Sequence, residues 1–248
     1  MNQRIAVVTG GTGTIGTEIC KHLADSGYHV VALCLAGMPD CPIDEWEAAR
    51  RAEGRAMNAR TCNVADFDDT VATFRSIETE IGSVSALVNA AGITRDAAVR
   101  KMSVDQWRAV LSANLDSVFN TTRCVIEGMM ERGFGRIVNI SSVNGQKGQF
   151  GQANYAASKA GMHGFTMSVA REGARKGVTC NTVSPGYIES PMIMAVPEEH
   201  RAKIVAEIPV GRFGKPSEIA RVVAFLAAEE SAFITGADIS VNGGQHMG

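Results

Sequence analysis

Short apolar runs alternate with stretches of helical periodicity along most of this chain, and this alternation constrains the fold more than any other feature. The apolar runs are residues 5–9, 29–35, 56–62, 84–89, 136–140, 178–183 and 238–241. The helical stretches are residues 15–25, 66–81, 104–131, 152–176 and 217–228. Because the runs are rich in valine, isoleucine and alanine, we expect strands buried on both faces, with right-handed crossovers placing helices on both sides of a parallel sheet. The pattern predicts an α/β, doubly wound fold with a central parallel sheet of about seven strands.

The overall composition narrows the class of protein. Of the 248 residues, 45% are hydrophobic and 20% are charged, which suits one compact domain over residues 1–248. The net charge of -2 and the scattered lysines and arginines leave no basic stripe for nucleic acid. No apolar run approaches the ~20 residues of a membrane-spanning helix, and no cleavable leader precedes the first strand. We therefore expect a cytoplasmic protein without a nucleic-acid or membrane partner.

The segment 190–209 is the least patterned part of the chain. It carries three prolines and an acidic stretch between two regular segments. Long irregular segments inside compact domains often serve as lids over binding sites. We therefore expect a mobile substrate lid at 190–209, and a merely irregular connection is the alternative.

Neither the cysteines nor the histidines show the spacing of a metal site. The six cysteines are spread along the chain, mostly in apolar segments, at positions 20, 34, 41, 62, 124 and 180. Such cysteines are typical of buried free thiols in a reducing compartment. We expect free thiols and no catalytic metal.

The first predicted strand leads through a glycine-rich turn into a helix. The turn reads Thr9-Gly10-Gly11-Thr12-Gly13-Thr14-Ile15-Gly16. Glycines let the backbone approach a pyrophosphate, and free amides with the helix dipole supply positive potential. After the first strand of a Rossmann fold, such a turn predicts dinucleotide binding. The fourth strand ends in Asn89-Ala90-Ala91-Gly92, whose small residues would let an adenosine ribose lie close to the backbone. The alternative for Asn89 is that it satisfies backbone groups in the core.

Tyr155 and Lys159 stand four residues apart in a predicted helix, and Ser142 precedes the tyrosine by thirteen residues. Residues i and i+4 share one helix face, so the phenol and the ammonium can point into one cleft. A nearby positive charge stabilises a phenolate, so we expect the pKa of Tyr155 to be lowered toward useful acid–base strength. Taken alone, the pair is also typical of a solvated helix face.

In order and spacing, these motifs resemble the short-chain dehydrogenases/reductases over nearly the whole chain. The resemblance rests on the turn from Thr9 to Gly16, the segment from Asn89 to Gly92, Asn114, Ser142, Tyr155, Lys159 and Ser184-Pro185-Gly186. It implies catalysis by Asn114, Ser142, Tyr155 and Lys159. It also implies a nicotinamide dinucleotide site made by Thr9, Gly10, Gly11, Thr12, Gly13, Thr14, Ile15, Gly16, Asn63, Val64, Asn89, Ala90, Gly92, Tyr155, Lys159, Pro185, Gly186 and Ile188.

The resemblance gives each catalytic side chain a role in carbonyl reduction. Tyr155 would give the proton to the ketone oxygen, and Ser142 would hydrogen-bond that oxygen. Lys159 would hold the ribose hydroxyls and lower the pKa of the tyrosine, while Asn114 would anchor a water that leads protons to the lysine. Negative charge develops on the ketone oxygen, so donors aimed at it stabilise the transition state. Ser141 is the alternative to Ser142, but neighbouring strand residues point to opposite sides, and the family spacing favours Ser142.

Four segments narrow the resemblance to bacterial acetoacetyl-CoA reductases of polyhydroxybutyrate synthesis. They are residues 92–96, 144–155, 184–188 and 242–248. The narrower resemblance implies reduction of the 3-keto group of acetoacetyl-CoA to (R)-3-hydroxybutanoyl-CoA, carried out by a homotetramer. The acetoacetyl group would be bound by Asp96, Gln149, Phe150, Gln152 and Tyr187. For Phe150 the alternative is packing against the lid.

The sequence departs from the family pattern at two places where a nucleotide is expected to bind. Thr14 takes the position of the second family glycine, and a glycine stands one place earlier at Gly13, which bears on affinity and loop shape. The loop after the second strand carries acidic residues at positions 40, 44 and 45 before its first arginine at position 50. Acidic groups repel the 2'-phosphate of NADPH, the usual donor of these reductases. We therefore expect the cofactor to be NADP(H) or NAD(H), with substantial use of NADH.

Two other functions remain open at this point. A 3-oxoacyl-[acyl-carrier-protein] reductase of fatty-acid synthesis would use the same chemistry on a different thioester. The basic residues at positions 95, 100 and 101 could face either an acidic carrier protein or the phosphates of coenzyme A. A non-catalytic nucleotide-binding sensor is the more remote possibility, since a fold does not fix function. The complete set of catalytic residues argues against it.

Overall fold

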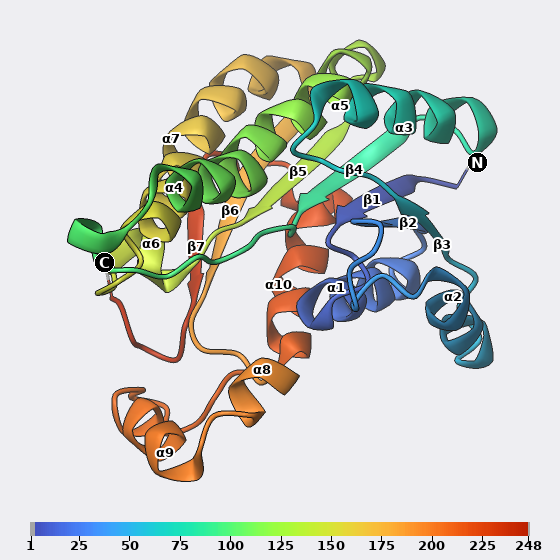
Figure 1. Ribbon diagram of the computed structural model, residues 1–248. Helices are drawn as coiled ribbons and strands as arrows, with labels where there is room; N and C mark the ends of the chain where they lie inside the picture. Colours follow the sequence, from blue (N-terminus) through green and yellow to red (C-terminus); the bar gives the residue numbers. More distant parts are fainter. Residues whose placement is uncertain (1–2, 248) are drawn as a thin grey trace.

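The computed structural model describes residues 3–247, and these form a seven-stranded sheet covered by helices on both faces (Figure 1). The strand order is β3-β2-β1-β4-β5-β6-β7, and every neighbouring pair is parallel. The strands are β1 Ile5–Thr9, β2 His29–Cys34, β3 Asn58–Thr61, β4 Val84–Asn89, β5 Gly135–Ile140, β6 Val178–Pro185 and β7 Asp238–Val241. The predicted doubly wound α/β fold is confirmed.

The helices divide between the two faces of the sheet (Figure 1). One face carries α1 Thr14–Asp25, α2 Ile43–Ala52 and α10 Pro216–Ala227. The other carries α3 Phe67–Glu80, α4 Val104–Leu111, α5 Ser117–Arg132 and α7 Ala153–Gly173. The short helix α6, Val143–Lys147, follows β5, and single turns of 3₁₀-helix lie at Val99–Lys101, Ala174–Lys176 and Glu229–Ser231. Within the described part of the chain, no helix is long and apolar enough to span a membrane.

The hydrophobic core has two halves, one on each side of the sheet. Ala6 and Val8 of β1 point into the half that contains α1 and α10. Ile5 and Val7 point into the half that contains α3, α5 and α7. Neighbouring strand residues face opposite sides, so a strand covered on both faces is apolar at most of its positions. This packing explains the run of apolar residues in β1.

Two helical segments differ from the prediction. The stretch 104–131, expected as one regular helix, contains a π-helical turn at Ser112–Asp116 between α4 and α5. The helix α2 occupies a segment that the sequence pattern left without a regular element. Its only buried residue is Trp46, so it lacks the apolar stripe by which helices are predicted.

The segment 190–209 contains two short helices and projects away from the sheet (Figure 1). They are α8 Pro191–Met194 and α9 Glu198–Ala206, and α9 buries none of its residues. The segment is therefore ordered but only loosely packed on the rest of the protein. Its role as a substrate lid remains a prediction.

Cys34 and Cys41 form a disulfide with a Cα–Cα distance of 5.4 Å, so the expectation of free thiols is wrong for these two residues. A tight loop returns the chain from the end of β2 and brings the second cysteine back to the first. The sequence spacing gave no sign of this contact. The cysteines that remain free are Cys20, Cys62, Cys124 and Cys180, and burial raises the pKa of each thiol.

Candidate active site

The strand order reverses between β1 and β4, the first strands of the two halves of the sheet. Doubly wound sheets bind ligands beyond the carboxyl ends of the strands at such a switch point. Thr9 ends β1 there, and its hydroxyl accepts hydrogen bonds from the backbone N–H groups of Ala90 and Ala91, each at 3.0 Å. This contact holds together the two strand ends that flank the switch point.

The glycine-rich turn is packed too tightly for side chains at two of its positions. A Cβ atom at Gly16 would lie 2.0 Å from the carbonyl oxygen of Gly10. Gly10 itself has a φ angle of +63°, which L side chains rarely adopt. At Gly11 a Cβ atom would lie 2.7 Å from the Cβ of Ala32 on the neighbouring strand. These glycines let the turn fold back on itself and lead directly into α1.

Thr14 is the first residue of α1, and its side chain is exposed. The preceding Gly13 is extended, no side chain caps the helix, and its first turn contains no acidic residue. The first amide groups of the helix are therefore available to an anion, which the helix dipole also favours. The Thr14 side chain stands at the wall of the site and leaves the amides accessible.

A cavity of about 430 Å³ lies beside this turn. It is lined by ten of the residues predicted to bind the nucleotide, namely Gly10, Thr12, Gly13, Thr14, Ile15, Gly16, Asn63, Val64, Ala90 and Gly92. Residues from the ends of β2 and β3, including Leu33, Cys34 and Cys62, complete the wall. The size, the apolar wall and the free amides of α1 all fit a dinucleotide.

The remaining predicted nucleotide residues lie outside this cavity lining. They are Thr9, Gly11, Asn89, Tyr155, Lys159, Pro185, Gly186 and Ile188. Asn89 is buried, donates to Asn139 Oδ1 at 2.8 Å and accepts from the Thr121 hydroxyl at 2.7 Å. Its side chain therefore bonds other side chains in the core, whereas the alternative interpretation expected bonds to backbone groups. The role of Asn89 in nucleotide binding remains a prediction. Pro185 ends β6, and Ser190, a few residues further along, lines the cavity from the side of the lid segment.

The phenol of Tyr155 and the hydroxyl of Ser142 lie together at the ends of α7 and β5. Burial raises the pKa of Tyr155, a hydrogen bond with Ser142 lowers it, and the negative charge of Asp96 raises it further. The net effect is upward, so the expected lowering of this pKa is wrong for the protein without a nucleotide. Ser141 faces the other way, donates to the Lys159 carbonyl at 2.9 Å and is buried.

Lys159 is buried, and its ammonium donates to the carbonyl oxygen of Ile140 at 2.7 Å. Burial lowers the pKa of Lys159 from 10.5 to about 8. Its Nζ atom lies 5.6 Å from the centre of the Tyr155 ring, so the two groups do share one cleft. A Cβ atom at Gly92 would lie 3.5 Å from the same Nζ, and Gly92 lines the nucleotide cavity. The lysine therefore stands between the cavity and Tyr155.

Asn114 lies in the π-helical turn between α4 and α5 and is fully buried. Its side chain pairs with the backbone of Ile93, accepting from the N–H at 2.8 Å and donating to the carbonyl at 3.0 Å. It also donates to the Ser158 hydroxyl at 3.2 Å. Wide π turns are often found at functional sites, because they reorient a side chain inside a helix. Here the turn fixes Asn114 beside Gly92 and Lys159.

The predicted substrate residues form two groups. Gln152 donates to Asp96 at 2.8 Å and accepts from Asn144 at 2.9 Å, which makes a polar chain beside the catalytic tyrosine. Phe150 is 91% exposed, so it does not pack against the lid segment, and Gln149 is exposed next to it.

Tyr187 stands apart from that chain, after β6. It lines a smaller cavity of about 110 Å³ together with Ile208 at the base of the lid segment. Burial raises its pKa, as do the negative charges of Glu207 and Asp96. Asp96 and Gln152 thus lie on the side of Tyr155, and Tyr187 lies at the base of the lid segment.

Two buried asparagines at the site were not predicted. The side chain of Asn144 donates to Gln152, and its backbone N–H donates to the Ser142 hydroxyl. Asn154 lies in the first turn of α7, where its side chain accepts from the N–H of Tyr155 and donates to the carbonyl of Arg95 at 3.0 Å. It thereby fixes the helix end that carries the tyrosine. Both asparagines lie in the segment 144–155, which carries part of the family resemblance, and this position could have marked them as site residues.

A proton donor of this kind beside a dinucleotide cradle defines the protein as an oxidoreductase that depends on a nicotinamide cofactor. The chain belongs to the short-chain dehydrogenase family, whose model matches residues 4–201. It is 56% identical to an acetoacetyl-CoA reductase of Cupriavidus necator over the full length of both chains. It is 54% identical to an acetoacetyl-CoA reductase of Allochromatium vinosum, over 98% of this chain and 99% of the relative. A 3-oxoacyl-[acyl-carrier-protein] reductase of Vibrio harveyi is 42% identical, over 98% of each chain.

Proposed function

We propose that this protein reduces the 3-keto group of acetoacetyl-CoA to give (R)-3-hydroxybutanoyl-CoA for polyhydroxybutyrate synthesis. The observation that carries the proposal is full-length identity of 56% and 54% to two acetoacetyl-CoA reductases. The adjacent Ser142, Tyr155 and Lys159 side chains support it, because they supply what carbonyl reduction requires. Residues 1–248 form a single dinucleotide-binding and catalytic domain in this proposal.

The catalytic side chains divide the work of the reaction. When bound, the reduced nicotinamide supplies the hydride. Tyr155 holds the proton destined for the ketone oxygen, and its raised pKa keeps it protonated at neutral pH. Ser142 donates to the same oxygen, and one such oriented donor is worth on the order of 3 kcal/mol. Lys159 orients the ribose, while Asn114 holds the backbone at Ile93 in place and anchors a water that returns protons to the lysine.

On the substrate side, Asp96, Gln149, Gln152 and Tyr187 bind the acetoacetyl thioester, and Phe150 covers its short acyl chain. The exposure of Phe150 supports this role, since an apolar ring free of protein contacts is available to a ligand. The segment 190–209 closes over the bound substrate as a lid. Its loose packing and its start at Ser190, in the cavity wall, support such a motion.

We propose that the protein uses NADH substantially, with NADPH as the weaker donor. Asp40 lines the nucleotide cavity, and its carboxylate would repel a 2'-phosphate but accept a hydrogen bond from a ribose hydroxyl. The first arginine after β2, Arg50, is held in an ion pair with Glu53 at 2.8 Å and is therefore engaged elsewhere. The ratio of kcat/KM for the two donors tests this statement, and a large advantage of NADPH would contradict it.

Resemblance also supports a homotetramer. Exposed apolar side chains on α4, α5 and α7 support contact between subunits, including Trp107, Phe119 and Met167. Light scattering during gel filtration would give the molar mass of the assembly. A cytoplasmic location is part of the proposal, since coenzyme A thioesters and nicotinamide cofactors are available there.

The decisive experiment is an absorbance assay of nicotinamide oxidation with acetoacetyl-CoA, run in parallel with NADH and NADPH. A Tyr155→Phe variant should lose the activity, because phenylalanine cannot hold the proton. A Tyr28→Phe variant is the matched control, since Tyr28 is buried in the core and its hydroxyl donates to the carbonyl of Ala227 at 2.7 Å. Oxidation that survives in Tyr155→Phe would refute the proposed role of the tyrosine.

The second candidate function is reduction of 3-oxoacyl groups on an acyl carrier protein. It is favoured by the 42% identity to the Vibrio harveyi enzyme and by the exposed cations Arg95, Arg100 and Lys101. Comparing kcat/KM for acetoacetyl-CoA and for the acetoacetyl carrier protein separates the two functions. A clear preference for the carrier protein would replace our proposal.

A further inference from the structure

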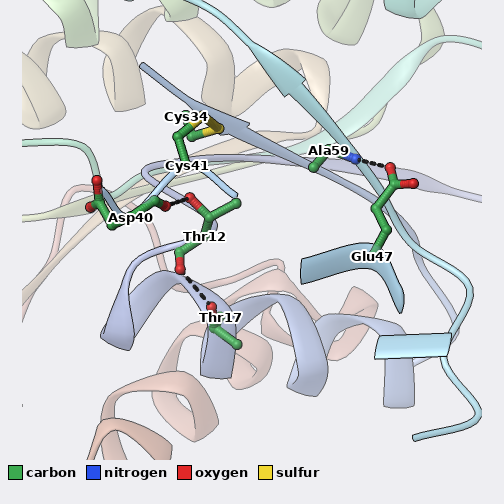
Figure 2. Close-up of a disulfide and its surroundings, with 7 residues drawn as sticks. All are labelled: Thr12, Thr17, Cys34, Asp40, Cys41, Glu47 and Ala59. Carbon is green, nitrogen blue, oxygen red and sulfur yellow. Dashed lines mark hydrogen bonds between the residues drawn. A yellow bond between two sulfur atoms is a disulfide. The ribbon is translucent and has the colours of Figure 1, made fainter. Parts of the chain in front are cut away.

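The Cys34–Cys41 disulfide closes a loop of six exposed residues, 35–40, at the carboxyl end of β2 (Figure 2). Cys34 is buried at the end of the strand, and Cys41 precedes α2 by two positions. Within the loop, the backbone N–H of Met38 donates to Leu35, and the N–H of Cys41 donates to Met38. No side chain of residues 35–40 is buried, so packing does little to fix their position.

This loop forms part of the wall of the nucleotide cavity. Cys34, Leu35, Met38 and Asp40 all line it, opposite the glycine-rich turn. The loop is joined to that turn through Asp40, whose backbone carbonyl accepts a hydrogen bond from the Thr12 hydroxyl (Figure 2). The Asp40 carboxylate lies 3.6 Å from the position that a Cβ atom of Gly13 would occupy.

The turn and α2 provide a fixed frame around the loop. Thr17 of α1 donates to the carbonyl of Thr12 at 3.1 Å and accepts from the indole N–H of Trp46 at 2.9 Å. Glu47 of α2 accepts from the backbone N–H of Ala59 on β3 at 2.7 Å (Figure 2). These bonds hold the turn and α2 in place without the disulfide. The loop itself is held by the disulfide and by the bond from Thr12 to the Asp40 carbonyl.

The placement of Asp40 matters because of charge. A nucleotide with a free ribose 2'-hydroxyl can donate to a carboxylate, whereas a 2'-phosphate is a dianion that a carboxylate repels. The strength of this discrimination falls when the carboxylate can move away into solvent. A loop that is held at both ends keeps the charge near the turn, and a loop released at Cys41 does not.

We propose that the Cys34–Cys41 disulfide is a positioning element for nucleotide selection, which makes the preference for NADH over NADPH depend on the thiol redox state. The inference rests on the nucleotide binding in the proposed function, not on the identity of the thioester. In the oxidised protein, the disulfide holds Asp40 against the glycine-rich turn. In the reduced protein, the loop is mobile and NADPH is accepted more readily.

The redox step is an exchange with a dithiol reductant. A thiolate of the reductant attacks the sulfur of Cys41, which is the more accessible of the two, and Cys34 leaves as a thiolate that takes up a proton. The second thiol of the reductant then displaces Cys41, which also ends as a thiol. Two electrons and two protons pass to the protein, and the reductant becomes a disulfide.

The test measures nucleotide binding rather than turnover. Protein purified without reductant and protein treated with dithiothreitol are titrated with NADH and with NADPH, following nicotinamide fluorescence. Thiol titration of the denatured protein should find the four free cysteines before treatment and all six after it. The ratio of the NADPH Kd to the NADH Kd should fall roughly tenfold on reduction, the factor expected for a carboxylate moved away from a phosphate dianion ~6 Å distant in water.

Three variants make the outcome specific. Cys41→Ser should behave like the reduced protein with and without dithiothreitol. Asp40→Asn should lose both the discrimination and its response to dithiothreitol. Cys124→Ser, a partly buried free cysteine on α5, is the matched control and should keep the full response.

Several results would overturn the inference. One is six free thiols in the untreated protein. Another is a Kd ratio that is the same in the oxidised protein, the reduced protein and Cys41→Ser. If neither nucleotide binds in any state, the proposed function fails and this inference fails with it. If both bind with an unchanged ratio, only the redox dependence is lost.

Discussion

The buried ammonium of Lys159 should give the reductase a characteristic alkaline limit. The pKa of Lys159 is lowered to about 8 because burial penalises its charged form. Above that pH, Lys159 of the free enzyme is neutral, so it can no longer bind the ribose hydroxyls or stabilise the Tyr155 phenol through a positive charge. The pKa of Tyr155 is raised, so the tyrosine keeps its proton over the same range. Loss of activity between neutral pH and pH 10 should therefore follow the lysine.

The size of the effect follows from the fraction of charged lysine. With a pKa of about 8, roughly 90% of the lysine is protonated near pH 7 and roughly 10% near pH 9. The kcat/KM for the reduced nucleotide should therefore be flat below about pH 7 and fall about tenfold by about pH 9. The change from 10.5 to about 8 corresponds to about 3 kcal/mol against the ammonium form.

Initial rates of ketone reduction between about pH 6 and about pH 10 give this profile, because kcat/KM reports the pKa values of the free enzyme. A Lys159→Arg variant tests whether the alkaline fall in kcat/KM comes from Lys159, since a guanidinium keeps its charge throughout this range. Its residual kcat/KM should not fall near pH 8. A wild-type kcat/KM that stays constant to about pH 10 would refute the lowered pKa of Lys159. If kcat/KM of the arginine variant falls over the same pH range as that of the wild type, the fall comes from another group.

Three further outcomes follow from the geometry. Gly16→Ala should abolish nucleotide binding in fluorescence titrations, because its Cβ would lie 2.0 Å from the Gly10 carbonyl; retained affinity would contradict the tight turn. Ser142→Ala should lower kcat/KM by about 100-fold, and a loss below about tenfold would remove Ser142 from the transition state. Asn139→Ala should lower the free energy of unfolding in urea by about 2 kcal/mol, because the buried Asn89 amide loses its partner at 2.8 Å; a change below about 0.5 kcal/mol would contradict this.

The strands and the glycine-rich turn were predictable because their signals are local. A strand buried on both faces is rich in apolar residues, and a turn that leads into a helix N-terminus needs glycine where the backbone folds back. The position of Gly16 is such a case, since its constraint lies only six residues away at Gly10. The spacing of Tyr155 and Lys159 predicted a shared cleft for the same reason, and their side chains do meet there.

The features that escaped prediction depend on distant contacts or on the balance of opposing effects. The helix α2 buries Trp46 alone, and the indole of Trp46 bonds Thr17 of the distant helix α1. The disulfide joins cysteines whose closeness arises from the path of an exposed loop. The pKa of Tyr155 was predicted with the wrong sign, because burial outweighs the stabilising contacts. Sequence spacing predicts which side chains lie near each other, but it does not predict how deeply they are buried.

The π-helical turn at Ser112–Asp116 limits how this chain can change in length. The turn holds one residue more than a regular helical turn would. Deleting any one of its residues would close it to a regular α-helical turn and move Asn114 from its place in the helix. The bonds between its side chain and the backbone of Ile93 would then be lost. Homologous chains should therefore vary in length in the surface loops and keep the residue count of this helix constant.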